Sequence, residues 1–141
     1  MDTKATRLKL AGSSDANKEE LWDLAYDQSS EIRRKVAANP WTDWEILVYL
    51  SYDRSPAVRV SVASNSSTPE DVIDELAKDA NQDVRFCLAQ NSCLPVHTLH
   101  LLSKDENKRV RTRAINTLKE LGLATPEVVP LENNTQVTPN L

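Results

Sequence analysis

Apolar residues recur along this chain in a pattern that repeats every 26 residues. Within each repeat they are three or four residues apart, as on one side of a helix. The pattern predicts an all-α chain of about four repeats, each made of two short helices. Three apolar columns carry the period: Leu21/Leu47/Ile73/Leu99, Leu24/Leu50/Leu76/Leu102 and Ile32/Val58/Val84/Val110.

Polar residues keep the same period. An arginine follows each β-branched apolar residue, an aspartate lies six residues before it, and an asparagine lies six residues after it in three repeats. The arginines fall at the edge of the predicted core, so we interpret them as structural rather than as a phosphate site. The asparagines are placed to end the second helices. The columns are Arg33/Arg59/Arg85/Arg111, Asp27/Asp53/Asp79/Asp105 and Asn39/Asn65/Asn91, with Thr117 in the fourth repeat.

The predicted helices are short, and their starts carry capping signals. Thr42 and Thr68 precede first helices, and proline follows Thr68 at the first helical position. A helix of about nine residues spans only ~14 Å and is marginal alone, so each must be held by its neighbours.

The ends of the chain differ from its middle. Residues 1–16 are predicted to be a polar N-terminal segment, and 17–122 a single domain of four repeats. Gly122 is expected to stop the last helix, and 123–141 is predicted to be a loose C-terminal tail.

The repeat resembles known helical families. The string Asp-x5-Arg, with Val before the Arg and Ala four residues after it, resembles HEAT-like repeats. The longer string Leu-x-x-Leu-Ala/Ser-x-Asp-x4-Val-Arg-x-x-Val-Ala-x-Asn-Pro/Ser resembles the leucine-rich repeat variant family over about residues 17–119. The resemblance implies a right-handed α-solenoid whose second helices line a concave, binding side. It also implies hydrogen bonds between arginine and aspartate within and between repeats.

Composition excludes several functions. The net charge of −4 argues against wholesale nucleic-acid coating, and two glycines leave no nucleotide-binding loop. One branch of the variant family carries an iron–sulfur module with cysteines before the repeats, but here no cysteine precedes Cys87, so we expect no cofactor. No apolar run is long enough to span a bilayer, and no signal peptide is recognisable. We expect a cytoplasmic monomer that does not bind membranes.

A partner-binding surface is predicted on the exposed side of the second helices. Basic residues lie at its two ends, with small or apolar residues between them, a combination that suits a peptide or an acidic segment. The competing interpretation is that Phe86 packs sideways and the charges only solvate the surface. The residues are Arg34, Lys35, Val60, Phe86, Arg109 and Arg113.

Aromatic residues are concentrated in the first two repeats. Tyr and Trp are enriched at binding hot spots, so Trp22 and Trp44 are candidates for a second contact region. The same residues are also suited to filling gaps between helices or sealing the open end of the core.

Catalysis finds little support. His97 and His100 share one short predicted helix near Cys93, which allows a Cys/His pair or two imidazoles on one side for a metal. No further ligand or orienting group is evident nearby. We therefore expect no enzyme activity, no catalytic residues and no metal.

The leading hypothesis is a non-catalytic protein-binding adaptor or scaffold. The alternatives are a HEAT-like protein that binds nucleic acid through a local basic face, and a purely structural protein whose repeat ends stack into oligomers. The basic face would consist of Arg34, Lys35, Lys108, Arg109, Arg113 and Lys119.

Overall fold

The computed structural model describes residues 2–123, which form α-helices and turns and contain no β-strand. The predicted tail lies outside the described residues, apart from residue 123. The helices of the described part are α1 (Lys4–Ala11), α2 (Lys18–Ala25), α3 (Ser30–Ala38), α4 (Trp44–Leu50), α5 (Pro56–Ser64), α6 (Glu70–Leu76), α7 (Gln82–Ala89), α8 (Val96–Leu102) and α9 (Lys108–Glu120).

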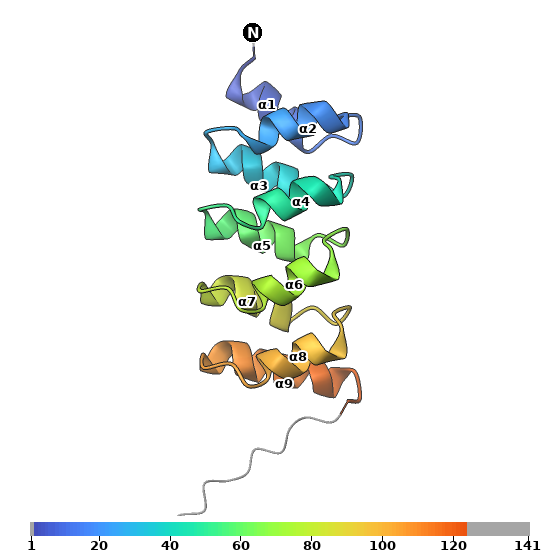
Figure 1. Cartoon of the computed structure of the whole chain (residues 1–141), viewed down its shortest axis with the longest axis vertical. Helices are drawn as coiled ribbons and strands as arrows, with labels where there is room; N and C mark the ends of the chain where they lie inside the picture. Colours follow the sequence, from blue (N-terminus) through green and yellow to red (C-terminus); the bar gives the residue numbers. More distant parts are fainter. Residues whose placement is uncertain (1, 124–141) are drawn as a thin grey trace, which may run out of the picture.

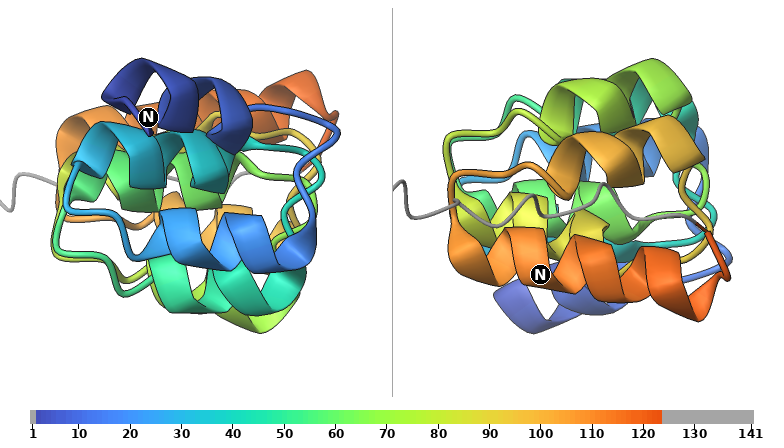
Figure 2. Two further views of the ribbon diagram at one scale, coloured as in Figure 1. Left: turned by 90° about the horizontal axis from the view of Figure 1, so that it is seen from above. Right: turned by 90° about the horizontal axis from the view of Figure 1, so that it is seen from below.

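The helices stack in two columns along the long axis (Figure 1). The odd-numbered helices α1 to α9 form the second-helix column, in which each helix contacts the next. The even-numbered helices α2 to α8 form the first-helix column, and each contacts the odd-numbered helix that follows it. Views along the stack show the columns as two adjacent layers (Figure 2).

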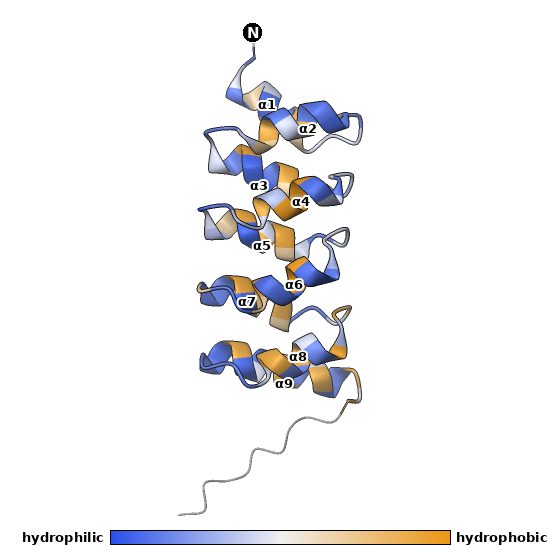
Figure 3. Ribbon diagram, in the orientation of Figure 1, coloured by the Kyte–Doolittle hydropathy of each residue, from blue (hydrophilic) through white to orange (hydrophobic). Residues whose placement is uncertain are grey.

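The core lies along the seam between the columns. All members of the three predicted apolar columns are buried, with Leu47, Leu50 and Val58 completely inaccessible. Figure 3 shows the hydrophobic segments gathered toward this seam and hydrophilic segments on the outer ends of the helices. Because the helices are short, this contact between elements, rather than helix propensity, supplies most of their stability.

The N-terminal segment differs from the prediction. Residues 1–16, predicted to be polar and outside the repeats, contain α1, which packs against α3. Thr3 caps this helix by accepting a hydrogen bond from the Thr6 N–H, and Ala11 is completely buried. Arg7 lies 26 residues before Arg33. Helix α1 therefore occupies the place of an additional second helix.

An arginine–aspartate ladder joins consecutive repeats. Arg59 donates from Nε and Nη2 to the Asp79 carboxylate of the next repeat at 2.7 and 3.0 Å. Its Nη1 donates to the Asp53 carbonyl of its own repeat at 2.7 Å. The Asp53 carboxylate in turn accepts the Ser55 N–H at the start of α5. The same bridges form in the pairs Arg33–Asp53 and Arg85–Asp105, which confirms the expected bonds within and between repeats.

Electrostatics keep the ladder ionised. Hydrogen bonding to Asp79 raises the pKa of Arg59 against the opposing effect of burial. Burial by itself raises the pKa of Asp53, but hydrogen bonds from Arg33 and the Ser55 N–H outweigh it, and the net pKa lies below the usual value. In the Arg33–Asp53 bridge the pKa of the arginine is raised and that of the aspartate is lowered, so both are charged near neutral pH, and the bidentate geometry satisfies their polar atoms.

The ladder ends differently at each end of the stack. Arg7 Nε lies 3.2 Å from Asp27 Oδ2 in an ion pair that lacks hydrogen-bond geometry. At the other end, Arg111 donates to the Asp105 and Glu106 carbonyls and has no carboxylate partner within residues 2–123.

Asparagines close the turns after the second helices. The Asn65 side-chain amide donates to the Ala37 and Asn39 carbonyls of the preceding repeat, while its oxygen accepts the Ser67 N–H. Asn39 bonds in the same way, which confirms the predicted role for these two residues. Asn91 keeps only the bond from Cys93 N–H among the described residues, and Thr117 donates its hydroxyl to the Ala89 carbonyl instead.

The threonines that were predicted to cap the first helices bond to the preceding helices instead. Thr42 and Thr68 donate their hydroxyls to the Val36 and Val62 carbonyls of the preceding helices. The N-cap residues of α4 and α6 are Asp43 and Pro69, and neither makes a side-chain capping bond, so the prediction that Pro69 takes the first helical position is wrong. At the C-terminal end, Gly122 has a φ of 69° and stops α9 as predicted.

We predict that Arg59→Ala destabilises the protein more than Arg34→Ala. The first leaves the part-buried Asp79 carboxylate without its partner and costs about 2–3 kcal/mol. Arg34 is exposed, so its removal stays within about 0.5 kcal/mol. Urea unfolding midpoints measure both, and an equal loss or the reverse order would contradict the role of the ladder.

A second comparison tests the asparagine column. Asn65→Ala removes the donor for two main-chain carbonyls and is expected to cost about 2 kcal/mol. Asn91→Ala removes only one accepted bond and is expected to cost less than about 1 kcal/mol. Thermal unfolding of the two variants should separate them, and indistinguishable midpoints would show that the cross-repeat amide bonds contribute little.

Candidate partner-binding surface

Charge is segregated between the two columns. When the ladder arginines are set aside, the second helices carry eight basic and three acidic residues, whereas the first helices carry one basic and eight acidic residues. The chain as a whole is acidic, and most of the basic residues that lie in helices are on the second-helix column. The eight basic residues are Lys4, Lys9, Arg34, Lys35, Lys108, Arg109, Arg113 and Lys119.

An apolar row runs through the second-helix column. Val60 on α5 and Phe86 on α7 occupy equivalent positions 26 residues apart, and both are half-buried against the core. The equivalent positions on α1 and α3 are Leu8 and Arg34, so the charged Arg34 separates Leu8 from Val60. Consecutive helices of the column are in contact, so these positions lie on neighbouring helices. We call these residues, with the exposed charges of the same helices, the second-helix face.

Two hollows follow this face. A hollow of about 500 Å³ is lined by Phe86, Arg109 and Arg113, together with other residues of α9. A second hollow of about 340 Å³ is lined by Arg34 and Val60, together with Asp83. The structure thus places the predicted residues in two groups on one surface. Lys35 is exposed on α3, next in sequence to Arg34.

Phe86 carries a cation on its ring. The guanidinium carbon of Arg109 lies 3.8 Å from the centre of the Phe86 ring, within the range of a cation–π contact. Arg109 also lies 3.4 Å from the Asp83 carboxylate. The aromatic ring and the cation therefore form one surface, in which Phe86 packs against the core and remains partly accessible.

Several cations on this face lack acidic partners. Lys4 pairs with Glu31 at 2.7 Å and lowers the pKa of that carboxyl, and Arg113 pairs with Glu120 at 3.2 Å. The basic residues that form no ion pair within the described part of the chain are Lys9, Arg34, Lys35, Lys108 and Lys119.

The predicted tryptophans lie on the other column. Trp22 is half-buried and stacks with Tyr26 at a centroid distance of 6.0 Å. Tyr49 packs against both rings. Trp44, by contrast, is 58% exposed and makes no ring contact of this kind within the described residues. Trp22 therefore packs within a cluster, while Trp44 remains a surface residue.

Tyrosines rather than tryptophans line the adjoining pocket. A depression of about 440 Å³ is bordered by Tyr26, Tyr49 and Tyr52, with the ladder residues Arg33 and Asp53 at its base. The crowding of aromatic residues in the first two repeats indicated this region, but only the helix packing determines which rings meet.

The imagined Cys/His pair does not form. His97 bonds to the Asp74 carboxylate at 3.1 Å, and neither His97 nor His100 bonds to Cys93 among the described residues. Cys87 contacts Ser64 at 2.9 Å and forms no disulfide.

Comparisons with known proteins do not assign this chain to a family. No protein family matches this chain, and no curated protein sequence is significantly similar to it. Within residues 2–123, every helix is too short or too polar to cross a bilayer.

Proposed function

We propose that the protein is a non-catalytic adaptor that binds an acidic, extended protein segment along its second-helix face. The observation that carries the proposal is the segregation of charge, which concentrates the basic side chains of the helices on one column of an acidic chain. Such a field attracts acidic partners and repels basic ones.

The apolar row gives the partner something besides charge to recognise. Half-buried Val60 and Phe86 offer apolar contact, and the hollows beside them can accept side chains. Rim charges mainly set the association rate and the choice of partner, whereas aromatic and apolar anchors supply affinity. A segment that alternates acidic and apolar residues would match both features.

The proposal also covers the fold class, the cellular location and the oligomeric state of the protein. The stack of two-helix units, the ladder and the 26-residue period together support a right-handed α-solenoid of the HEAT-like or leucine-rich repeat variant kind. We also propose that it acts as a cytoplasmic monomer, which suits two cysteines that form no disulfide.

Nucleic acid is a weaker match to the same surface. Arg109 and Arg113 are already engaged by Asp83 and Glu120, and the apolar residues Val60 and Phe86 occupy the middle of the face. Phosphate backbones require a continuous set of available cations.

A pair of synthetic peptides tests the proposal. One alternates glutamate with leucine and the other lysine with leucine, and binding is followed by fluorescence anisotropy. Only the glutamate peptide should bind, and Arg34→Glu/Lys35→Glu should weaken it at least roughly tenfold because attraction becomes repulsion. The matched control, Lys78→Glu/Lys104→Glu, makes the same charge change at exposed sites outside the second helices and should bind like the wild type.

A second pair of variants tests the apolar row. Phe86→Ala should weaken the glutamate peptide several-fold, whereas Leu101→Ala, at an exposed leucine on α8, should not. Equal affinity for both peptides, or equal loss in the test and control variants, would overturn the proposal. Tight binding of duplex DNA that displaces the peptide would replace it with the nucleic-acid alternative.

A further inference from the structure

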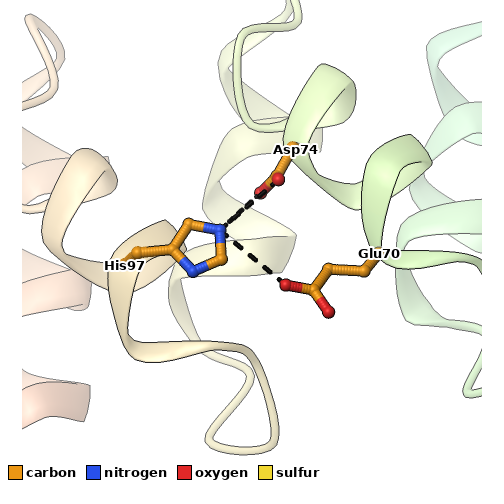
Figure 4. Close-up of side chains that lie close together, drawn as sticks. All are labelled: Glu70, Asp74 and His97. Carbon is orange, nitrogen blue, oxygen red and sulfur yellow. Dashed lines mark hydrogen bonds and ion pairs between the residues drawn. The ribbon is translucent and has the colours of Figure 1, made fainter.

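Three potential metal ligands converge between α6 and α8, away from the second-helix face. Glu70 and Asp74 lie one turn apart on α6, and His97 lies in the first turn of α8 (Figure 4). His97 Nε2 is 3.1 Å from Asp74 Oδ1 and 4.0 Å from Glu70 Oε1. One ligand atom from each residue lies within 4.8 Å of the others.

A buried hydroxyl orients the cluster. Thr98 is completely buried, and its Oγ1 donates to Asp74 Oδ1 at 3.0 Å. This bond holds the Asp74 carboxylate in place, and both of its oxygens lie close to His97 Nε2, Oδ1 at 3.1 Å and Oδ2 at 3.4 Å. Hydrogen bonds of this kind, from outside the ligand set, orient metal-binding side chains and strengthen binding.

The position of the cluster in the repeat is also informative. Glu70 and His97 are 27 residues apart, the same separation as Lys18 and Glu45, which form an ion pair between α2 and α4. At the equivalent positions between α6 and α8, Glu70 replaces Lys18 and His97 replaces Glu45. The basic partner is thus replaced by an acid. Neither Glu70 nor Asp74 pairs with a lysine or arginine in the described part of the chain, so two carboxylates face one imidazole.

The turn that leads into α8 has fewer polar bonds than its equivalents. Leu94 occupies the place of Thr42 and Thr68, and the Asn91 amide nitrogen makes no hydrogen bond within residues 2–123. A cation bound between α6 and α8 would stabilise the start of α8, where this turn ends.

We propose that Glu70, Asp74 and His97 bind a divalent transition-metal ion of the Zn²⁺ class and that the ion links the third repeat to the fourth. An imidazole nitrogen with two carboxylate oxygens suits zinc or cobalt, whereas calcium and magnesium prefer oxygen ligands alone. Tetrahedral coordination at 2.0–2.1 Å places ligand atoms about 3.3 Å apart, so the exposed side chains of Glu70 and His97 need to move inward by no more than about 1.5 Å. Water would complete the coordination shell.

Zinc titration of the full-length protein tests the site. Calorimetry should show one Zn²⁺ bound per chain, and Zn²⁺ should raise the thermal unfolding midpoint. His97→Gln should weaken binding at least roughly tenfold and abolish the midpoint shift, and Asp74→Asn should do the same. The matched controls His100→Gln and Asp71→Asn should retain both effects, because neither residue belongs to the cluster.

Two further variants distinguish this site from zinc binding at the exposed Cys93 thiol. Thr98→Val keeps the shape of the buried side chain but removes the bond to Asp74, and should weaken Zn²⁺ binding roughly tenfold. Cys93→Ser should leave Zn²⁺ binding unchanged. Circular dichroism confirms that each variant is folded before Zn²⁺ is added. Absence of Zn²⁺ binding to the wild type, or unchanged binding by His97→Gln, would overturn the proposal, and neither result bears on peptide binding at the second-helix face.

Discussion

The bridge from each arginine to the aspartate of the next repeat is the interaction on which the arrangement depends. Helices of seven to nine residues cannot persist alone, and their apolar sides are covered only when the units stack. The bridge specifies how they stack, because both carboxylate oxygens are engaged by one guanidinium. The same aspartate also accepts a main-chain N–H at the start of its own second helix. One side chain therefore sets the turn within a unit and the register between units.

The period of the sequence was enough to predict the helices and the buried columns, and the resemblance to HEAT-like repeats implied the participation of Arg59 and Asp79 in the ladder. It did not identify which aspartate each arginine meets. The spacing of six residues points to the aspartate of the same repeat, but Arg59 reaches only the carbonyl of Asp53 and directs its other nitrogens forward. The Asp53 carboxylate is directed away because it accepts the Ser55 N–H and the Arg33 guanidinium. Choices of this kind depend on three-dimensional placement that a linear pattern does not contain.

Other differences also have specific causes. Arg7 and Ala11 lie in register with later repeats, but Thr6 occupies the position of the β-branched apolar residue. Because that apolar residue is missing, the sequence pattern did not predict α1. The basic and apolar residues of the candidate binding face share helix positions that the period reveals, whereas its two hollows and the stacking of Arg109 on Phe86 depend on how side chains from different helices meet. The cluster that includes His97 joins residues on two helices, and no local spacing could have indicated it.

The separation of charge has a consequence before any contact is made. With the ladder arginines set aside, basic residues exceed acidic ones by five on the second helices, and acidic residues exceed basic ones by seven on the first. The molecule thus has an electric dipole across its narrow dimension. A charged partner within about one Debye length, ~8 Å at physiological ionic strength, would exert a torque on that dipole and turn the protein about its long axis. The face presented at first collision would then be selected by rotation during approach, before the shape of either surface is tested.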